Sequence, residues 1–400
     1  MIIAPASSAC MAAGAKQFRK GKLMDHRERV LAAANHLEPD FVPTAIWGSA
    51  HGITDPLYFD LLKRLDLGEP LPPFRPRMGH TINYYDDRLL EALDIDVRHA
   101  DIGFTDLGGP TRGGGTDSWG VRYAQTGLYL GAISFPLERA TVPDLDSYSW
   151  PGVENLVNRD EFRRRAQFLK EKTGYAVVGR AFDSYGPFER CCALRKTDRF
   201  MIDLGLDPEF ALKLIEKVTE VHLRLLEIYL ETAGRYLDII ELPGDDYAAT
   251  FPLISPKMFD RFFAPAWQRT IGLIKSAAPQ AKILFHSDGN MEPFLGRLVD
   301  LGVDIFHCLE PLPNVDMARI KAAYGQKLCF WGGIDIKQAL QQDEATVEAE
   351  VKRRIRLLGQ GGGYVLAPAN HLQPDVPAQN VIALFRAARQ FGKYPLEFES

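Results

Sequence analysis

The stretch GVDIFHCLEPLPNVDMARIKAAYGQKLCFWGGID, residues 302–335, contains one complete unit of the fold. VDIFH (303–307) and KLCFW (327–331) are apolar runs that predict two buried strands, and residues 316–324 between them predict a helix. Both runs are continuously apolar rather than alternating, which is typical of parallel strands covered by helices on both faces. The stretch therefore predicts a strand–helix–strand unit.

The same unit repeats along most of the chain. Seven apolar strands, each followed by a helix, are predicted at residues 42–47, 175–180, 237–242, 282–286, 303–307, 327–331 and 363–368. An eighth strand can come from residues 93–100 or from the region near 115–135. This repetition favours an α/β fold, a single (β/α)8 TIM barrel. The alternative is an open doubly wound sheet, but no GxGxxG follows a strand and opens a helix.

Helix boundaries carry their own signals. Asp25 is a predicted N-cap, with Glu28 three residues later in a capping-box arrangement. A long helix begins at Asp207-Pro208 and stops near Gly234. The predicted helices cover residues 25–36, 160–173, 208–234, 256–278, 294–301, 316–324, 343–358 and 376–391.

The domain organisation follows from these elements. We expect residues 25–395 to form one barrel, preceded by a flexible N-terminal leader at 1–24. An irregular Gly-rich insertion lies at about 66–150 and includes a hairpin through 121–135.

Composition excludes several classes of protein. The net charge of −5 comes without a basic stripe, which argues against nucleic acid as a partner, and no apolar window is long enough for a membrane span. Five cysteines, including the adjacent Cys191 and Cys192, argue against a disulfide framework. The apolar start of the chain lacks the charged region of a signal peptide. We expect a cytoplasmic protein whose partner is a small molecule, and leave a homodimer open.

Polar residues collect where the predicted strands end, which in a barrel is the active-site face. These residues are Trp47, Arg180, Tyr185, Glu241, Asp245, Asp246, His286, Asp288, Asn290, Cys308, Glu310, Asn370 and His371. Their joint placement predicts an enzyme rather than a structural barrel.

HSDG (286–289) is the most informative tetrapeptide. His286 ends an apolar strand, and Asp288 follows two residues later, so both groups can face one centre. Imidazole and carboxylate suit zinc and also suit acid–base work. With Cys308 and His371 at the same mouth, these residues make three or four candidate metal ligands. A hydrogen-bonded structural His–Asp pair is the alternative.

The catalytic candidates are Asp245, Asp246, His286 and His371. Adjacent carboxylates raise one another's pKa, so one of the two aspartates can carry a proton. Arg180 can anchor a substrate carboxylate or form a salt bridge at the rim. The candidate substrate-binding residues are Trp47, Arg180, Tyr185, Glu241, Asn290, Glu310 and Asn370. We expect Asp245, His286, Asp288 and His371 to share one cavity.

Several motifs resemble the uroporphyrinogen decarboxylase superfamily, which includes corrinoid-linked methyltransferases. The resemblance runs over about residues 25–395 and implies a (β/α)8 barrel with its site at the mouth. The motifs are RERVLAA (27–33), DSWGVRY (117–123), GDD (244–246), LISPKMFDRFFAP (253–265), FHSDGN (285–290), GVDIFHCLEP (302–311), FWGGID (330–335) and GGGYVLAPANHLQPDVPAQNV (361–381).

The two branches of that superfamily differ in their motifs. The decarboxylases carry N-terminal arginines that hold porphyrinogen carboxylates, whereas VPTAIWGSAHGITDPLYF (42–59) has no arginine. The methyltransferases use His-x-Cys-Gly and a later Cys to bind zinc. The resemblance carries over His286 directly, Asp288 with changed chemistry, and His371 only roughly. A harder site of this kind suits an oxygen substrate or water better than a thiolate.

The resemblance thus implies a methyltransferase that takes a methyl group from a small methoxylated or methylated compound. Zinc and a corrinoid carried by a separate protein are its implied cofactor and partner. The alternatives are a cofactor-free decarboxylase of uroporphyrinogen-like or smaller carboxylates, and a catalytically silent barrel that binds a metabolite.

Overall fold

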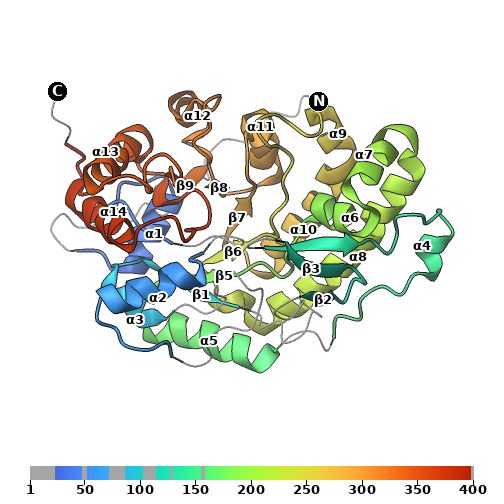
Figure 1. Ribbon diagram of the computed structural model, residues 1–400, viewed down its shortest axis with the longest axis horizontal. Coiled ribbons are helices and arrows are strands. Elements are labelled where there is room, and N and C mark those ends of the chain that lie inside the picture. The colour runs from blue at the N-terminus through green and yellow to red at the C-terminus, as the bar shows by residue number, and fades with distance from the viewer. Residues whose placement is uncertain are drawn as a thin grey trace, which may run out of the picture.

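The computed structural model describes residues 23–46, 52–71, 86–101, 114–126, 129–154 and 158–397. A parallel sheet of seven strands lies at its centre, in the order β1-β5-β6-β7-β8-β9-β10 (Figure 1). The strands are β1 (Val97–Ala100), β5 (Ala176–Gly179), β6 (Ile239–Glu241), β7 (Lys282–His286), β8 (Ile305–Cys308), β9 (Cys329–Ile334) and β10 (Tyr364–Pro368). Each strand pairs with the next one of this sheet along the chain, which confirms the predicted α/β alternation. Of the two places considered for a further strand, residues 93–100 supply β1.

Helices flank this sheet (Figure 1). They include α5 (Arg159–Lys172), α8 (Pro208–Ala233), α10 (Ala264–Ala277), α11 (Glu292–Leu301), α12 (Met317–Tyr324), α13 (Glu344–Arg354) and α14 (Ala378–Phe391). The capping signals are confirmed: Asp25 and Glu28 form a capping box on α1 (His26–Ala34), and the Asp207 side chain caps α8. Within the described ranges, no helix has both the length and the apolar character needed to cross a bilayer.

Five further helices had no range predicted from the sequence. They are α2 (Asp55–Arg64), α3 (Asp87–Ala92), α4 (Asp144–Ser147), α6 (Pro187–Arg195) and α7 (Thr197–Leu206). Helix α6 begins with Pro187 directly after Gly186, a start signal that was available in the sequence.

Residues 43–45 lie between the two edges of the sheet. The Leu366 N–H donates to the Pro43 carbonyl (2.8 Å), and the Ala45 N–H donates to the Leu366 carbonyl (3.0 Å) on β10. On the other side, the Asp96 N–H beside β1 donates to the Thr44 carbonyl (3.0 Å). The predicted strand at 42–47 is therefore a single bridge at Thr44 in the described residues, and the regular strands of the parallel sheet number seven rather than eight.

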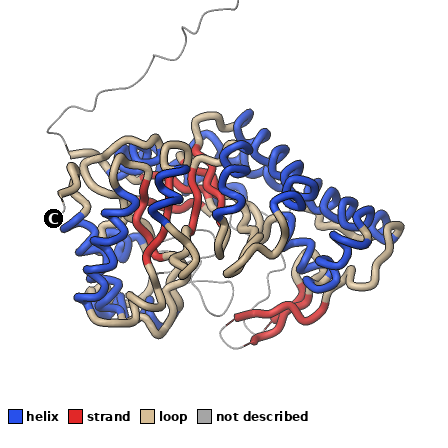
Figure 2. Tube along the Cα trace, turned by 90° about the horizontal axis from the view of Figure 1, so that it is seen from above, coloured by secondary structure: helices blue, strands red, loops and turns tan. Residues whose placement is uncertain are grey.

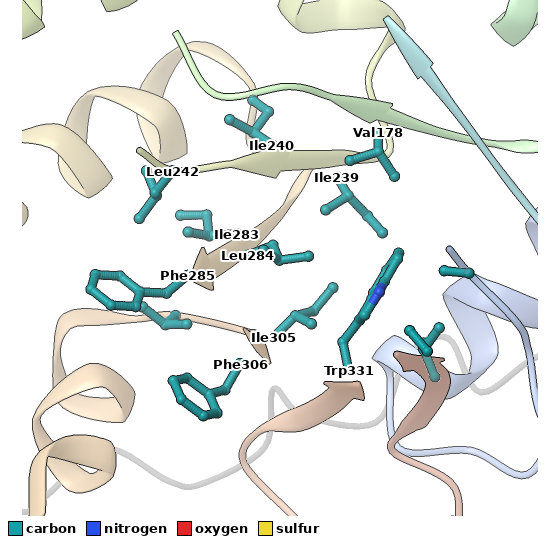
Figure 3. Packing of buried hydrophobic residues seen from close by; sticks show 14 of the residues in the cluster. Val178, Ile239, Ile240, Leu242, Ile283, Leu284, Phe285, Ile305, Phe306 and Trp331 are labelled. Atoms are coloured by element: carbon teal, nitrogen blue, oxygen red, sulfur yellow. The ribbon is translucent and has the colours of Figure 1, made fainter. Parts of the chain in front are cut away.

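Side chains alternate between the two faces of this sheet. In Figure 3, Ile239, Leu284 and Trp331 point to one side of the curled sheet, and Phe285 and Phe306 point to the other. All five are buried, because the first group packs inside the curl and the second packs beneath the surrounding helices.

A small antiparallel sheet stands apart from the parallel one (Figure 2). It consists of β2 (Gly114–Thr116), β3 (Arg122–Thr126) and β4 (Tyr129–Ser134), and β3–β4 is the hairpin predicted within the insertion. Arg190 of α6 attaches this sheet to the rest of the molecule. Its Nη1 lies 3.4 Å from Asp117 Oδ2, and its guanidinium lies 4.7 Å from the centre of the Trp119 ring.

Asp96 offers a test of how the sheet edges are joined. Its fully buried carboxylate accepts hydrogen bonds from Thr44 N (2.7 Å), Arg29 Nη1 (2.5 Å) and Arg389 Nη2 (3.1 Å). Asp96→Ala leaves the Thr44 N–H without its acceptor and removes one of the two aspartates that each arginine contacts, since Arg29 keeps Asp40 and Arg389 keeps Asp94. We expect a loss of roughly 1–3 kcal/mol in the free energy of unfolding, measured in urea. The exposed Asp60–Arg64 pair provides the control, and Asp60→Ala should cost about 0–1 kcal/mol. Equal losses would contradict the role assigned to Asp96.

Candidate functional site

Three predicted residues meet where β7 and β8 end. His286 is the last residue of β7, Asp288 follows two residues later, and Cys308 is the last residue of β8. Asp288 Oδ1 lies 3.9 Å from His286 Nε2 and 3.1 Å from Cys308 Sγ. One ligand atom from each of the three residues lies within 4.8 Å of the others. We call these residues the His-Asp-Cys cluster.

Glycines allow the backbone to approach this cluster closely. A Cβ on Gly244 would lie 2.8 Å from His286 Cδ2, so only glycine leaves room for the imidazole there. Gly332 of β9 has a φ of +119°, and a Cβ on it would lie 2.1 Å from the Cys308 carbonyl oxygen. Any larger residue at either position would have to displace a member of the cluster.

Neighbouring polar groups hold Asp288 in place. Asn370 Nδ2 donates to Asp288 Oδ2 (3.1 Å), and the Asp288 N–H donates to Asp246 Oδ1 (2.7 Å). Glu310 accepts from the adjacent Gly289 N–H (3.0 Å). Both carboxylate oxygens of Asp288 thus have a contact, one with Cys308 and one with Asn370.

Several acidic side chains lie close together around the His-Asp-Cys cluster. Burial raises the pKa of Asp288 to about 6, and the charges of Asp246 and Glu310 act in the same direction against His286. Glu189, half-buried in the first turn of α6, joins this group. Burial, together with the charges of Asp246, Asp245 and Asp288, raises the pKa of Glu189 well above its ordinary range.

This arrangement fits a divalent cation. Nitrogen, sulfur and oxygen donors are the set that zinc binds in proteins. Burial and Asp288 raise the pKa of the Cys308 thiol well above its ordinary value, so the thiol keeps its proton unless a cation replaces it. A bound cation would also offset the repulsion among the surrounding carboxylates.

His371 lies outside the grouped ligand atoms. It follows Asn370 directly, and its backbone N–H donates to Asn370 Oδ1 (2.7 Å). The His-Asp-Cys cluster thus contains three of the four metal ligands expected from the sequence, and the fourth, His371, is not part of it.

Asp245 has a structural contact that the sequence did not predict. Its fully buried carboxylate accepts from the Phe188 N–H (3.2 Å) and the Glu189 N–H (2.8 Å), and it also accepts from the Tyr247 hydroxyl. It therefore caps the N-terminus of α6, and the acid–base role that adjacency to Asp246 suggested stays a prediction. The carboxylate of Asp246 contacts the cluster, whereas that of Asp245 contacts α6.

The candidate substrate-binding residues have different environments in the structure. Arg180 Nη1 lies 2.7 Å from Asp101 Oδ2, which is the rim salt bridge considered as its alternative. Glu241 is fully buried at the end of β6, and the Tyr185 ring lies 4.9 Å from the Arg190 guanidinium. Trp47 lies outside the described residues.

Asn290 is engaged in the backbone around it. Its Oδ1 accepts from the Glu292 N–H (3.2 Å) at the start of α11, and its Nδ2 lies 3.5 Å from the Asn314 carbonyl. Asn290 therefore shapes the loop that follows the cluster.

Asn370, which donates to Asp288, and Glu310, which accepts from the adjacent Gly289 N–H, also line a pocket beside the cluster. The remaining lining residues are Pro311, Leu312, Pro313, Asp335, Ile336, Lys337, Gln338 and Ala369.

Two residues near the cluster had no role in the sequence-based site. Glu189 belongs to α6, which was not predicted, although GP at 186–187 is a helix-start signal. His307 was placed with the polar residues at the strand ends but was assigned no catalytic, binding or metal role. Its Nδ1 lies 2.8 Å from His286 Nδ1, a contact that depends on the register of β7 and β8.

A family model described as Uroporphyrinogen decarboxylase (URO-D) matches residues 163–391. Uroporphyrinogen decarboxylases of Synechococcus sp. (strain CC9605) and Parasynechococcus marenigrum (strain WH8102) are 24% and 23% identical over 183 residues, 46% of this chain. The chain spans about half the length of these curated relatives, since the matches cover 48% of each.

One solved structure is similar over nearly the whole chain. It is a methyltransferase from Methanosarcina mazei, with a TM-score of 0.62 and 20% identity, and the match covers 92% of this chain and 99% of that one. At this identity the similarity establishes the fold alone.

The cap at Asp245 predicts a pH-dependent stability. Burial raises the pKa of Asp245 to about 7, above the 3.8 of an ordinary aspartate, so the native state keeps a proton that the unfolded chain releases. This group therefore lowers the free energy of unfolding as the pH rises from about 4 to about 7. Asp245→Asn removes this titrating group, so the stability of the variant lacks this dependence on pH. The loss in free energy of unfolding that Asp245→Asn causes should therefore be smaller at pH 8 than at pH 5, by about 2–3 kcal/mol.

Urea unfolding at the two pH values measures this change. Asp343, the N-cap of α13, is the matched control, because hydrogen bonds from Thr346 lower its pKa and keep it ionised at both pH values. The cost of Asp343→Asn should be the same at pH 5 and pH 8. A cost of Asp245→Asn that is likewise unchanged would contradict the raised pKa.

Proposed function

Because this chain belongs to the uroporphyrinogen decarboxylase (URO-D) family, we propose that it is a methyltransferase built on that family's barrel. It would take a methyl group from a small methoxylated or methylated compound, with zinc held by the His-Asp-Cys cluster. The observation that carries the proposal is the convergence of imidazole, carboxylate and thiol within 4.8 Å at the ends of β7 and β8. In this proposal, residues 43–45 are counted as the eighth barrel strand.

Three residues would bind the metal directly: His286, Asp288 and Cys308. The ion would polarise the substrate oxygen and so stabilise the alkoxide that forms when the methyl group leaves. Three protein ligands leave a further position for substrate, as in catalytic zinc sites. His371, beside Asn370, remains a candidate for that fourth position.

Glu189 would supply the proton for the leaving oxygen. Burial and the neighbouring carboxylates raise the pKa of Glu189 well above its ordinary range, which favours the protonated form of this side chain. A carboxylic acid in that state can donate a proton to an alkoxide. Asp246 accepts the Asp288 N–H, and so it positions the loop that bears the ligand.

The pocket lined by Glu310, Lys337 and Asn370 is the proposed position of the substrate, because it adjoins the cluster. The methyl acceptor would be a corrinoid bound to a separate protein. Support for this partner comes from the sequence resemblance, and the fold is shared with a solved methyltransferase.

The second candidate is decarboxylation of a porphyrinogen-like carboxylate, which the names of the curated relatives favour. Electrostatics argue against it. A polycarboxylate at the mouth would meet Asp246, Asp288 and Glu310, whereas Arg180 is already paired with Asp101. A catalytically silent barrel that binds a metabolite is the third candidate.

The metal site predicts a specific loss of zinc. Purified chain loaded with zinc and desalted should retain about one equivalent, and His286→Ala, Asp288→Asn or Cys308→Ser should each weaken binding by roughly tenfold or more. Cys329→Ser is the control, because Cys329 is equally buried on the neighbouring strand β9 but lies outside the cluster. Elemental analysis and chelator competition measure the outcome. If the unsubstituted chain retains no zinc, the proposed metal site is wrong.

Methyl transfer itself predicts methylcobalamin as a product. The zinc-loaded chain, incubated with reduced cobalamin and a panel of methoxylated and methylated compounds, should form methylcobalamin, which is followed by its absorption spectrum. Glu189→Gln should lower this rate by about 10²–10⁴-fold, because the amide cannot supply the proton, while zinc content stays unchanged. Release of CO₂ from uroporphyrinogen without methyl transfer would favour the decarboxylase instead.

A further inference from the structure

The two histidines at the ends of β7 and β8 share one hydrogen bond. His286 and His307 are paired directly in the register of the parallel strands, so their side chains point to the same face. Their Nδ1 atoms lie 2.8 Å apart, and their ring centres lie 4.9 Å apart with the planes tilted by 41°. Both imidazoles are buried, with exposed fractions of 3% and 1%.

Such a contact holds a single proton. Two imidazole nitrogens at hydrogen-bond distance require that one donates and the other accepts, because two N–H groups would repel and two lone pairs would form no bond. Either His286 carries the proton on Nδ1, or His307 does. The two arrangements leave His286 Nε2 in opposite states when the ring is neutral: the first leaves a lone pair there and the second leaves an N–H.

His286 Nε2 is the atom that faces the proposed ligands. It lies 3.9 Å from Asp288 Oδ1, while Nδ1 faces His307, so the two nitrogens have separate directions. Gly244 packs against the ring at Cδ2, where a Cβ would lie 2.8 Å away, and this close approach limits rotation of the imidazole. A metal bound at Nε2 needs a lone pair on that atom, and hence a proton on Nδ1.

We propose that His307 is the positioning residue that sets the tautomer of His286, by accepting the Nδ1–H and thereby leaving Nε2 free to bind a metal. The proposal rests on the metal site of the proposed function. Metal-bound histidines usually donate their second N–H to a carboxylate or carbonyl. Here a neighbouring strand supplies a neutral imidazole for that purpose, and the next residue of the same strand, Cys308, supplies the thiol ligand.

Two substitutions of His307 distinguish the loss of its hydrogen-bond acceptor from the loss of its side-chain volume. In His307→Asn, the amide oxygen stands close to the position of Nδ1 and can still accept the proton of His286. His307→Leu has a similar size but no acceptor. Zinc dissociation constants, measured by competition with a chromophoric chelator, should rise about 10–100-fold in the Leu variant and remain within about threefold of the original in the Asn variant. Equal affinities in the two variants would overturn the proposal.

A spectrum of the unsubstituted chain tests the same point without any variant. Long-range ¹⁵N–¹H NMR of the zinc-loaded chain labelled with ¹⁵N-histidine should show His286 protonated at Nδ1 and metal-bound at Nε2, and His286→Ala identifies its signals. A proton on Nε2 of His286 would overturn the proposal, even if the Leu variant failed to fold.

The metal-free chain keeps this inference distinct from the proposed function. If the unsubstituted chain binds no zinc, the metal site fails, but the same spectrum still shows which histidine carries the shared proton. Protonated Nδ1 on His286 would support the role of His307 there as well, and protonated Nδ1 on His307 would overturn it.

Discussion

The rest of the structure depends on the hydrogen bonds by which residues 43–45 join the two edges of the parallel sheet. Thr44 accepts from Asp96 beside β1, and its neighbours exchange hydrogen bonds with Leu366 of β10. The buried carboxylate of Asp96 reinforces this contact, since it accepts from the Thr44 N–H and is neutralised by Arg29 and Arg389. An open parallel sheet leaves its edge strands far apart. Joining the edges brings the strand ends together around one mouth, where Asn370, after β10, can reach Asp288, after β7.

Close approach at the mouth has an electrostatic cost. Asp246, Asp288, Glu310 and Glu189 are brought together at half-buried positions, and burial raises the pKa of Asp288 and Glu189. Ordinary folds avoid such clusters because like charges repel strongly in a medium of low polarity. A protonated Glu189 and a cation at the His-Asp-Cys cluster would together relieve the repulsion, and both would serve methyl transfer.

Asp245 and Asp246 illustrate how neighbours in sequence acquire different roles. Their side chains point in different directions: Asp245 caps α6, and Asp246 receives the Asp288 N–H. The helix that Asp245 caps carries Glu189 toward the cluster and Arg190 toward the antiparallel sheet. One buried cap thus connects the insertion to the site.

The sequence by itself determined the alternation of strands and helices, the family, and the residues His286, Asp288 and Cys308 as candidate ligands. These features are local, because apolar runs, capping residues and strand-end motifs are each contained within a few positions. Only the tertiary structure decided that the regular strands of the parallel sheet number seven, that Asp245 is a cap, that Glu189 joins the acidic group, and that His286 shares a proton with His307. Those outcomes depend on strand register and on the approach of segments remote in sequence, so no local pattern contains them.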